Sequence, residues 1–201
     1  MEKKKLFCVP LVPQGIPDEL SNRYWAEVQE QIDRSEMSFG KITRLYHEAN
    51  DLAGEPGLKN IQTINEKGSQ FIKKTIEKGA ELQPLEDREL LLQIVDCQIF
   101  LGLRFLSMEV SEKISKLRPE ILEIYGKAIG GRREHILRQI SQTLKEGETG
   151  MLLMADEERI QLQFPPDIDV ILVRPPVLSE IEKWQTEAEK ERMMSNESND
   201  P

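Results

Sequence analysis

The residues with the clearest chemical potential form an acidic turn, in which Asp156, Glu157 and Glu158 directly follow a short apolar run. Three consecutive carboxylates supply oxygen ligands to a divalent cation, or one of them serves as a general base. A structural interpretation competes with this, because acids in the first turn of a short helix interact favourably with its positive end and face water. The structural interpretation is favoured, and the sequence identifies no catalytic residue, metal or cofactor.

A second candidate site is the run Gly130, Gly131, Arg132 and Arg133. Glycines before a helix expose backbone N–H groups to an anion, and neighbouring guanidinium groups hold a phosphate. The run lacks the G-x-x-x-x-G-K-[ST] pattern of a phosphate loop, and no strand is expected before it. A helix break with two solvated arginines is therefore the favoured interpretation, with anion binding as the alternative.

The remaining reactive side chains are few. His47 and His135 are far apart in sequence and neither has a second His or Cys at ligand spacing, so a zinc site is not expected. Cys8 and Cys97 lie in apolar surroundings and are expected to be buried free thiols, although a disulfide between them stays open. The motifs G-x-S-x-G, H-E-x-x-H and CxxC are absent.

The elements that must position these candidates lie between residues 132 and 174. Ile136, Ile140 and Leu144 recur at helical spacing, and Gly147 follows as a cap. Two continuous apolar runs, 151–154 and 168–173, indicate strands that are covered on both faces, as in a parallel sheet. We expect these strands to lie side by side at the centre of the fold. Ligands collect beyond the carboxyl ends of such strands, which would place the acidic turn at a site.

The rest of the chain is predicted to be mostly helical. A strand is expected at Leu6–Val12, ending near Val9 because Pro10 cannot donate to the ladder. Amphipathic spacing predicts further helices, and a short strand and a loop are expected between two of them. The expected helices are 18–34, 38–52, 66–78, 120–129, a short one at 156–161 and one opening at Ser179, with the loop at 53–57 and the short strand at 58–64.

A helix over Leu90–Val110 is predicted to be apolar nearly all round. Charges at Asp96, Arg104 and Glu109 argue against a membrane span, because charges at the centre of a bilayer are costly. A helix of this kind must be covered on nearly every side. We therefore expect a core helix or a homodimer formed through Leu90–Val110.

Composition indicates an acidic protein with one domain. The 201 residues carry a formal net charge of −9, which argues against nucleic acid as a partner, and a nucleic-acid accessory role through Arg132, Arg133 and Arg138 is a third alternative. We expect a single helix-rich α/β domain over 1–194, with a helical middle at 87–129, and a disordered tail at 195–201. The start of the chain lacks a secretion signal, which predicts a cytoplasmic protein.

Three segments carry a resemblance. The strings R-E-H-I-L-R-Q-I, L-K-E-G-E-T-G-M-L-L-M-A and P-P-D-I-D-V, between residues 133 and 170, resemble a set of uncharacterised prokaryotic α/β proteins, as do 5–11 and 66–82. They are similar in part to the TraB/ChaN/TIKI-type families. Where those families place a His after the strand, this chain has Glu158, so the resemblance implies a degenerate hydrolase-like site and no catalytic residue is carried over.

These observations favour an α/β protein with a small, mostly parallel sheet, packed by several amphipathic helices, that acts by binding or self-association. The alternative is a metal-dependent or anion-handling enzyme that uses Asp156, Glu157 or Glu158 together with Arg132. The two hypotheses differ in whether these side chains converge.

Overall fold

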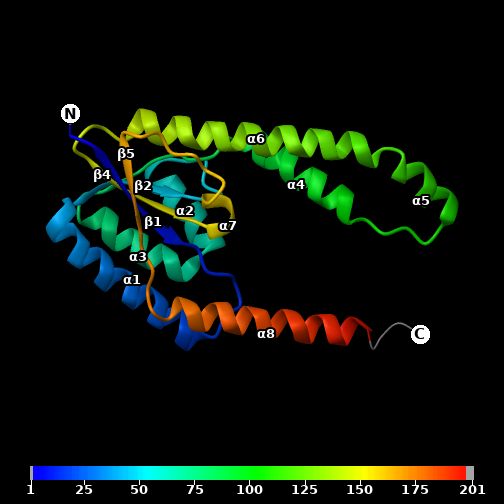
Figure 1. The fold of residues 1–201 in the computed structure, drawn as a ribbon, viewed down its shortest axis with the longest axis horizontal. Coiled ribbons are helices and arrows are strands. Elements are labelled where there is room, and N and C mark those ends of the chain that lie inside the picture. The colour runs from blue at the N-terminus through cyan, green and yellow to red at the C-terminus, as the bar shows by residue number, and fades with distance from the viewer. Residues whose placement is uncertain (1, 198–201) are drawn as a thin grey trace.

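The computed structural model describes residues 2–197 and contains a parallel five-stranded sheet with helices on both faces (Figure 1). The strand order is β3-β2-β4-β1-β5. The strands are β1 (Lys4–Pro10), β2 (Ile42–His47), β3 (Glu81–Leu82), β4 (Thr149–Met154) and β5 (Ile168–Leu172). The prediction of a helix-rich α/β fold with a parallel sheet is thus confirmed.

The two C-terminal strands are present where they were predicted, but they are not neighbours. β1 lies between them, with Phe7 paired to Met151 on one side and to Ile171 on the other. The expectation that they lie side by side is therefore wrong, and β5 is an edge strand with Val170 and Leu172 exposed. β1 can occupy the inner place because Pro10, which cannot donate a hydrogen bond, is its last residue.

Alternating side chains of the strands build two hydrophobic cores. On one face, Phe7, Val9 and Met151 pack against α1 (Asp18–Phe39), α2 (Gly54–Ile64), α3 (Glu66–Glu77) and the start of α8 (Leu178–Glu197). On the other face, Leu6 and Leu152 pack against α6 (Arg118–Thr143). Burial of both faces explains why these strands read as continuous apolar runs.

Two predicted elements are wrong in type. The segment 38–52, predicted as a helix, contains β2, and the segment 58–64, predicted as a short strand after a loop, belongs to α2. The spacing of Ile42, Leu45 and Tyr46 fits a helix as well as a strand that is buried on both faces, so periodicity alone does not separate the two. Gly40 and Ala49, both at positive φ, bound the strand and prevent a helix across it.

The helical middle also differs from the prediction. The expected helix over 90–110 is two helices, α4 (Arg88–Gly102) and α5 (Met108–Ser115). The helices expected at 120–129 and from 132 onward are one continuous α6, which runs through Gly130 and Gly131. Gly131 faces Leu90 of α4, and a Cβ there would make an ordinary van der Waals contact with that side chain at 3.4 Å.

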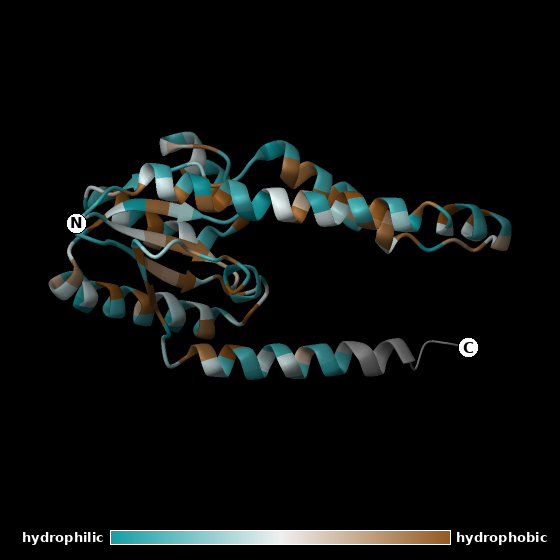
Figure 2. Cartoon of the chain, turned by 45° about the horizontal axis from the view of Figure 1, so that its top comes forward, coloured by the Kyte–Doolittle hydropathy of each residue, from teal (hydrophilic) through white to brown (hydrophobic). Residues whose placement is uncertain are grey.

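The outer parts of α4 and α6, with α5 at the tip, form an arm that projects from the sheet (Figure 1). Hydrophobic residues continue along this arm, away from the two cores (Figure 2). α8 also extends beyond the core, on the other side of the molecule from α6. Among the described residues, no helix combines the length and the apolarity that crossing a membrane requires.

The C-terminal helix α8 begins at Leu178, one residue before the predicted start at Ser179. It continues to Glu197, so the first three residues of the expected tail at 195–201 are helical. Residues 198–201 lie outside the described residues.

Candidate functional site

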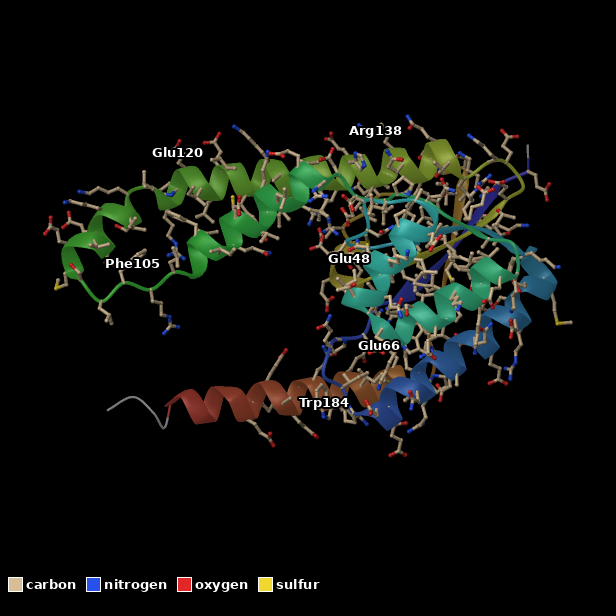
Figure 3. All side chains as sticks on the ribbon, turned by 180° about the vertical axis from the view of Figure 1, so that it is seen from behind. Glu48, Glu66, Phe105, Glu120, Arg138 and Trp184 are labelled. Carbon is tan, nitrogen blue, oxygen red and sulfur yellow. The ribbon has the colours of Figure 1, made fainter. Side chains whose placement is uncertain are left out.

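A cleft of about 640 Å³ lies at the carboxyl edge of the sheet, where a parallel sheet collects ligands. We call it the carboxyl-edge cleft. Its walls come from the loop after β1 (11–16), the start of α1, the end of β2 at 47–49 and the junction of α2 with α3 (63–67). Glu48 lies at the end of the core that faces the space between the arm and α8 (Figure 3).

His47, the last residue of β2, lines this cleft and is only 2% exposed. Its Nδ1 lies within hydrogen-bond distance of the backbone carbonyl of Glu48. A carbonyl only accepts, so Nδ1 carries the proton and Nε2 carries the lone pair. Within the described residues Nε2 is buried and has no hydrogen-bond partner. A buried acceptor without a partner is uncommon, because it loses water and gains nothing in return.

Burial also fixes the charge of this imidazole. Loss of water lowers the pKa of His47 to about 4, and the Glu48 carbonyl and the Glu86 carboxylate offset only part of that shift. At neutral pH the side chain is therefore uncharged, and its buried Nε2 is an acceptor. The same low pKa makes Nε2 a weak base.

Arg132 of α6 also lines the cleft, is 6% exposed, and lies at the centre of a cluster of charged side chains. Its Nε donates to Glu86 over 2.9 Å, and its two terminal nitrogens reach Glu86 over 2.6 Å, Glu48 over 3.0 Å and Glu158 over 3.2 Å. Four of the five guanidinium N–H donors can thus be satisfied by carboxylates. We call these four residues the Arg132 cluster.

The backbone also holds the carboxylates of the Arg132 cluster in place. Glu48 Oε2 accepts from the N–H of Ala155 over 2.8 Å, and Glu86 Oε1 accepts from the N–H of Ala49 over 3.2 Å. Burial favours the neutral form of Arg132, but the carboxylates of Glu86 and Glu48 outweigh it and raise its pKa above the ordinary value. The guanidinium therefore stays charged.

The structure brings only part of the predicted site together. Glu158 and Arg132 meet, but Asp156 instead pairs with Arg159 over 3.0 Å and with Arg174 over 2.7 Å. Glu157 is exposed, as expected of an acid in the first turn of a short helix, here α7 (Asp156–Arg159). The three consecutive carboxylates thus do not converge on one point.

The anion site predicted at Gly130, Gly131, Arg132 and Arg133 has a different local structure. Both glycines lie inside α6, where their N–H groups belong to the helix and do not face a ligand. The guanidinium of Arg132 is engaged by three carboxylates and is buried, so it is not a solvated arginine. Arg133 is half-buried, and its Nε has no hydrogen-bond partner within the described residues.

The sequence reasoning missed His47, Glu48 and Glu86 as site residues. The signal was the pair His47–Glu48 directly after an apolar run, which marks the carboxyl end of a strand. Because 38–52 was predicted as a helix, the pair was placed inside an element and not at its end. Glu86 had no such signal, because β3 is only two residues long.

The two cysteines are free and buried, which settles the question of a disulfide. Burial raises the pKa of the Cys8 thiol to about 12, so the thiolate is scarce at neutral pH. In the part of the chain that the structure describes, no group of three or more His, Cys, Asp or Glu side chains is placed to hold a metal ion.

Comparisons with family models, with curated proteins and with solved structures give no significant match to this chain.

Proposed function

We propose that this protein binds a small molecule in the carboxyl-edge cleft and that His47 Nε2 accepts a hydrogen bond from that ligand. The observation that carries the proposal is the buried Nε2, which has no partner among the residues that the structure describes and belongs to a side chain whose tautomer is fixed by its other nitrogen. A ligand N–H or O–H group would satisfy this acceptor and remove the cost of leaving it unpaired.

The same geometry supports binding over catalysis. A general base works best when its pKa lies near the working pH, and the pKa of His47 is about 4. The carboxylates of Glu48 and Glu86 are already held by Arg132 and by backbone N–H groups. The metal-dependent or anion-handling enzyme inferred as an alternative from the sequence therefore receives less support than a binding site.

A fragment panel tests the proposal. Ligand-observed NMR of the full chain should identify fragments that bind the wild type and lose at least about ten-fold in affinity in His47→Leu, which keeps the bulk and removes the acceptor. His135→Leu is the matched control, because it removes the only other imidazole and lies outside the residues that line the cleft. Fragments that bind both variants equally would contradict the proposal.

We also propose self-association as a second function, through a homodimer in which the α4–α5 side of the arm packs against a second copy. α4 packs on α6, and Ile94 and Cys97 on one face of α4 are buried. The opposite face repeats apolar residues at three- and four-residue spacing, with Leu92, Val95 and Ile99 about half exposed. Such spacing suits knobs-into-holes packing against another helix.

The size of this surface fits a second copy. Its members are Leu92, Val95, Ile99, Leu103, Leu106, Met108 and Val110, which are between 42% and 107% exposed. At roughly 100 Å² for a fully exposed aliphatic side chain, they present about 400 Å² of apolar area. A standard interface buries about 800 Å² per partner, of which somewhat more than half is apolar. One copy therefore offers about the apolar area that a dimer uses.

Light scattering at micromolar concentration tests the homodimer. The wild type should have twice the mass of the chain, and Ile99→Asp should reduce it to the monomer mass. Ile124→Asp places the same charge at an exposed position of α6, outside the proposed surface, and should leave the dimer intact. A wild-type monomer, or equal effects of the two variants, would contradict this second proposal.

A further inference from the structure

Charge is unevenly distributed along the carboxyl-edge cleft. Three carboxylates line it, those of Asp18, Glu48 and Glu66, against the two cations Lys67 and Arg132. Both cations are already engaged. Lys67 pairs with Asp18, and Arg132 is held by Glu48 together with two carboxylates outside the cleft. The net charge around the cleft is therefore negative, and neither cation is free to receive an anionic ligand.

One of the residues that line the cleft, His47, has an acceptor that is unpaired in the part of the chain that the structure describes. His47 Nε2 has the lone pair, is buried and has no partner within the described residues. A ligand that fits it must donate a hydrogen. A cationic N–H donor does so more strongly than a neutral one, and the excess of carboxylates favours a cation over a neutral molecule.

Part of the lining of the cleft is apolar. Leu11 and Ile16 from the loop after β1 and Trp25 from α1 form this part. Trp25 is fixed by stacking on Phe71, with ring centroids 5.5 Å apart, and by an edge contact with Tyr24. A rigid aromatic wall of this kind contributes contact area to an apolar group at little entropic cost.

We infer that the ligand of the carboxyl-edge cleft is a small amine with an apolar body, whose ammonium N–H donates to His47 Nε2 while its apolar part lies against Leu11, Ile16 and Trp25. This inference rests on the proposed function. A divalent cation fits less well, because hard cations take six or more oxygen ligands and the apolar wall supplies none. An anion fits less well, because Lys67 and Arg132 are already paired.

The tryptophan in the wall provides the assay. The chain has two tryptophans, so Trp184→Phe leaves Trp25 as the only indole reporter. Three probes of one shape are titrated into this full-length variant: phenethylammonium, the neutral 2-phenylethanol and the anionic 3-phenylpropionate. Phenethylammonium should change the emission of Trp25 saturably and bind at least about ten-fold more tightly than the alcohol, with the carboxylate weakest.

Substitutions then assign the charge preference to named groups. His47→Leu should weaken phenethylammonium binding about ten-fold or more. Glu66→Gln, at the exposed rim of the cleft, should weaken it two- to three-fold, roughly the effect of one exposed charge, and should not affect the alcohol. Glu77→Gln, at the other end of α3 and outside the cleft lining, is the matched control and should have no effect.

The outcomes separate this inference from the proposed function. If the alcohol binds as tightly as the ammonium and His47→Leu still abolishes binding, the amine inference is overturned and the proposed function stands. If the carboxylate, which has no hydrogen to donate, binds as tightly as the ammonium, both are overturned. A saturable response to Mn²⁺ that His47→Leu removes, without a response to the ammonium, likewise overturns the amine inference. If the ammonium binds and His47→Leu leaves its affinity unchanged, both fail.

Discussion

Arg132 and His47 are two buried polar side chains at the carboxyl edge of one sheet, and they differ in how completely their polar atoms are paired. Arg132 donates to three carboxylates, and two of these carboxylates are also held by backbone N–H groups. His47 uses one nitrogen and leaves the other without a partner within the described residues. We therefore regard the Arg132 cluster as structural and Nε2 of His47 as a group that can bind a ligand.

The largest effect is expected from breaking the paired cluster. Arg132→Met keeps most of the side-chain volume but leaves the fully buried carboxylate of Glu86 without its cation. Removing one partner of a buried ion pair costs about 3–5 kcal/mol, and we expect the free energy of unfolding to fall by that amount. Urea unfolding measures it, with Arg138→Met, an exposed position on the same helix, as the control. A loss below about 1 kcal/mol would remove the distinction between the two regions.

The next largest effect on the free energy of unfolding is expected from the protonation of His47 as the pH falls. The pKa of His47 is about 4 in the folded protein and 6.5 in an exposed histidine, so below pH 6.5 the unfolded chain takes up a proton that the folded chain does not. Stability is therefore highest above pH 6.5 and decreases towards pH 4, by roughly 3 kcal/mol from this group alone.

Comparison with His47→Leu isolates this contribution, since other carboxylates titrate in the same range. The wild type should lose more stability than the variant as the pH is lowered from 6.5 to about 4. If the free energies of unfolding of the two proteins decreased by the same amount between pH 6.5 and about 4, the imidazole would not be buried in its neutral form.

At neutral pH the same substitution should cost little. His47→Leu removes Nε2, which lacks a partner within the described residues, and a single hydrogen bond from Nδ1 to the Glu48 carbonyl, so the free energy of unfolding should change by no more than about 1 kcal/mol in either direction. This is the sharpest contrast with Arg132→Met, because both residues are nearly completely buried. A loss of several kcal/mol in His47→Leu would mean that Nε2 is paired in solution and would contradict this contrast.

The smallest effect is expected at the rim of the Arg132 cluster. The Glu158 side chain is 32% exposed and supplies one of the three carboxylates. Glu158→Gln should therefore change the free energy of unfolding by less than about 1 kcal/mol. If it matched the loss in Arg132→Met, the rim carboxylate and not buried Glu86 would be the principal partner, which the same urea titration would reveal.

The sequence was sufficient to predict the fold class and the presence of the two C-terminal strands, because β4 and β5 are bounded by clear turn and proline signals. It was not sufficient for β2, because a strand buried on both faces lacks the alternation that would separate it from a helix. That error moved His47 and Glu48 away from the strand end, and with them the candidate site. The pairing of Arg132 with Glu86 joins residues 46 positions apart, which no local pattern encodes.

The measurement that tests the central claim most directly is a long-range proton–nitrogen correlation spectrum of the two histidines at neutral pH, with His47 assigned by comparison with His135→Leu. The account predicts a neutral His47 with the proton on Nδ1, and an Nε2 signal that shifts when phenethylammonium is added. A proton on Nε2, or an Nε2 signal that no cleft ligand shifts, would contradict it.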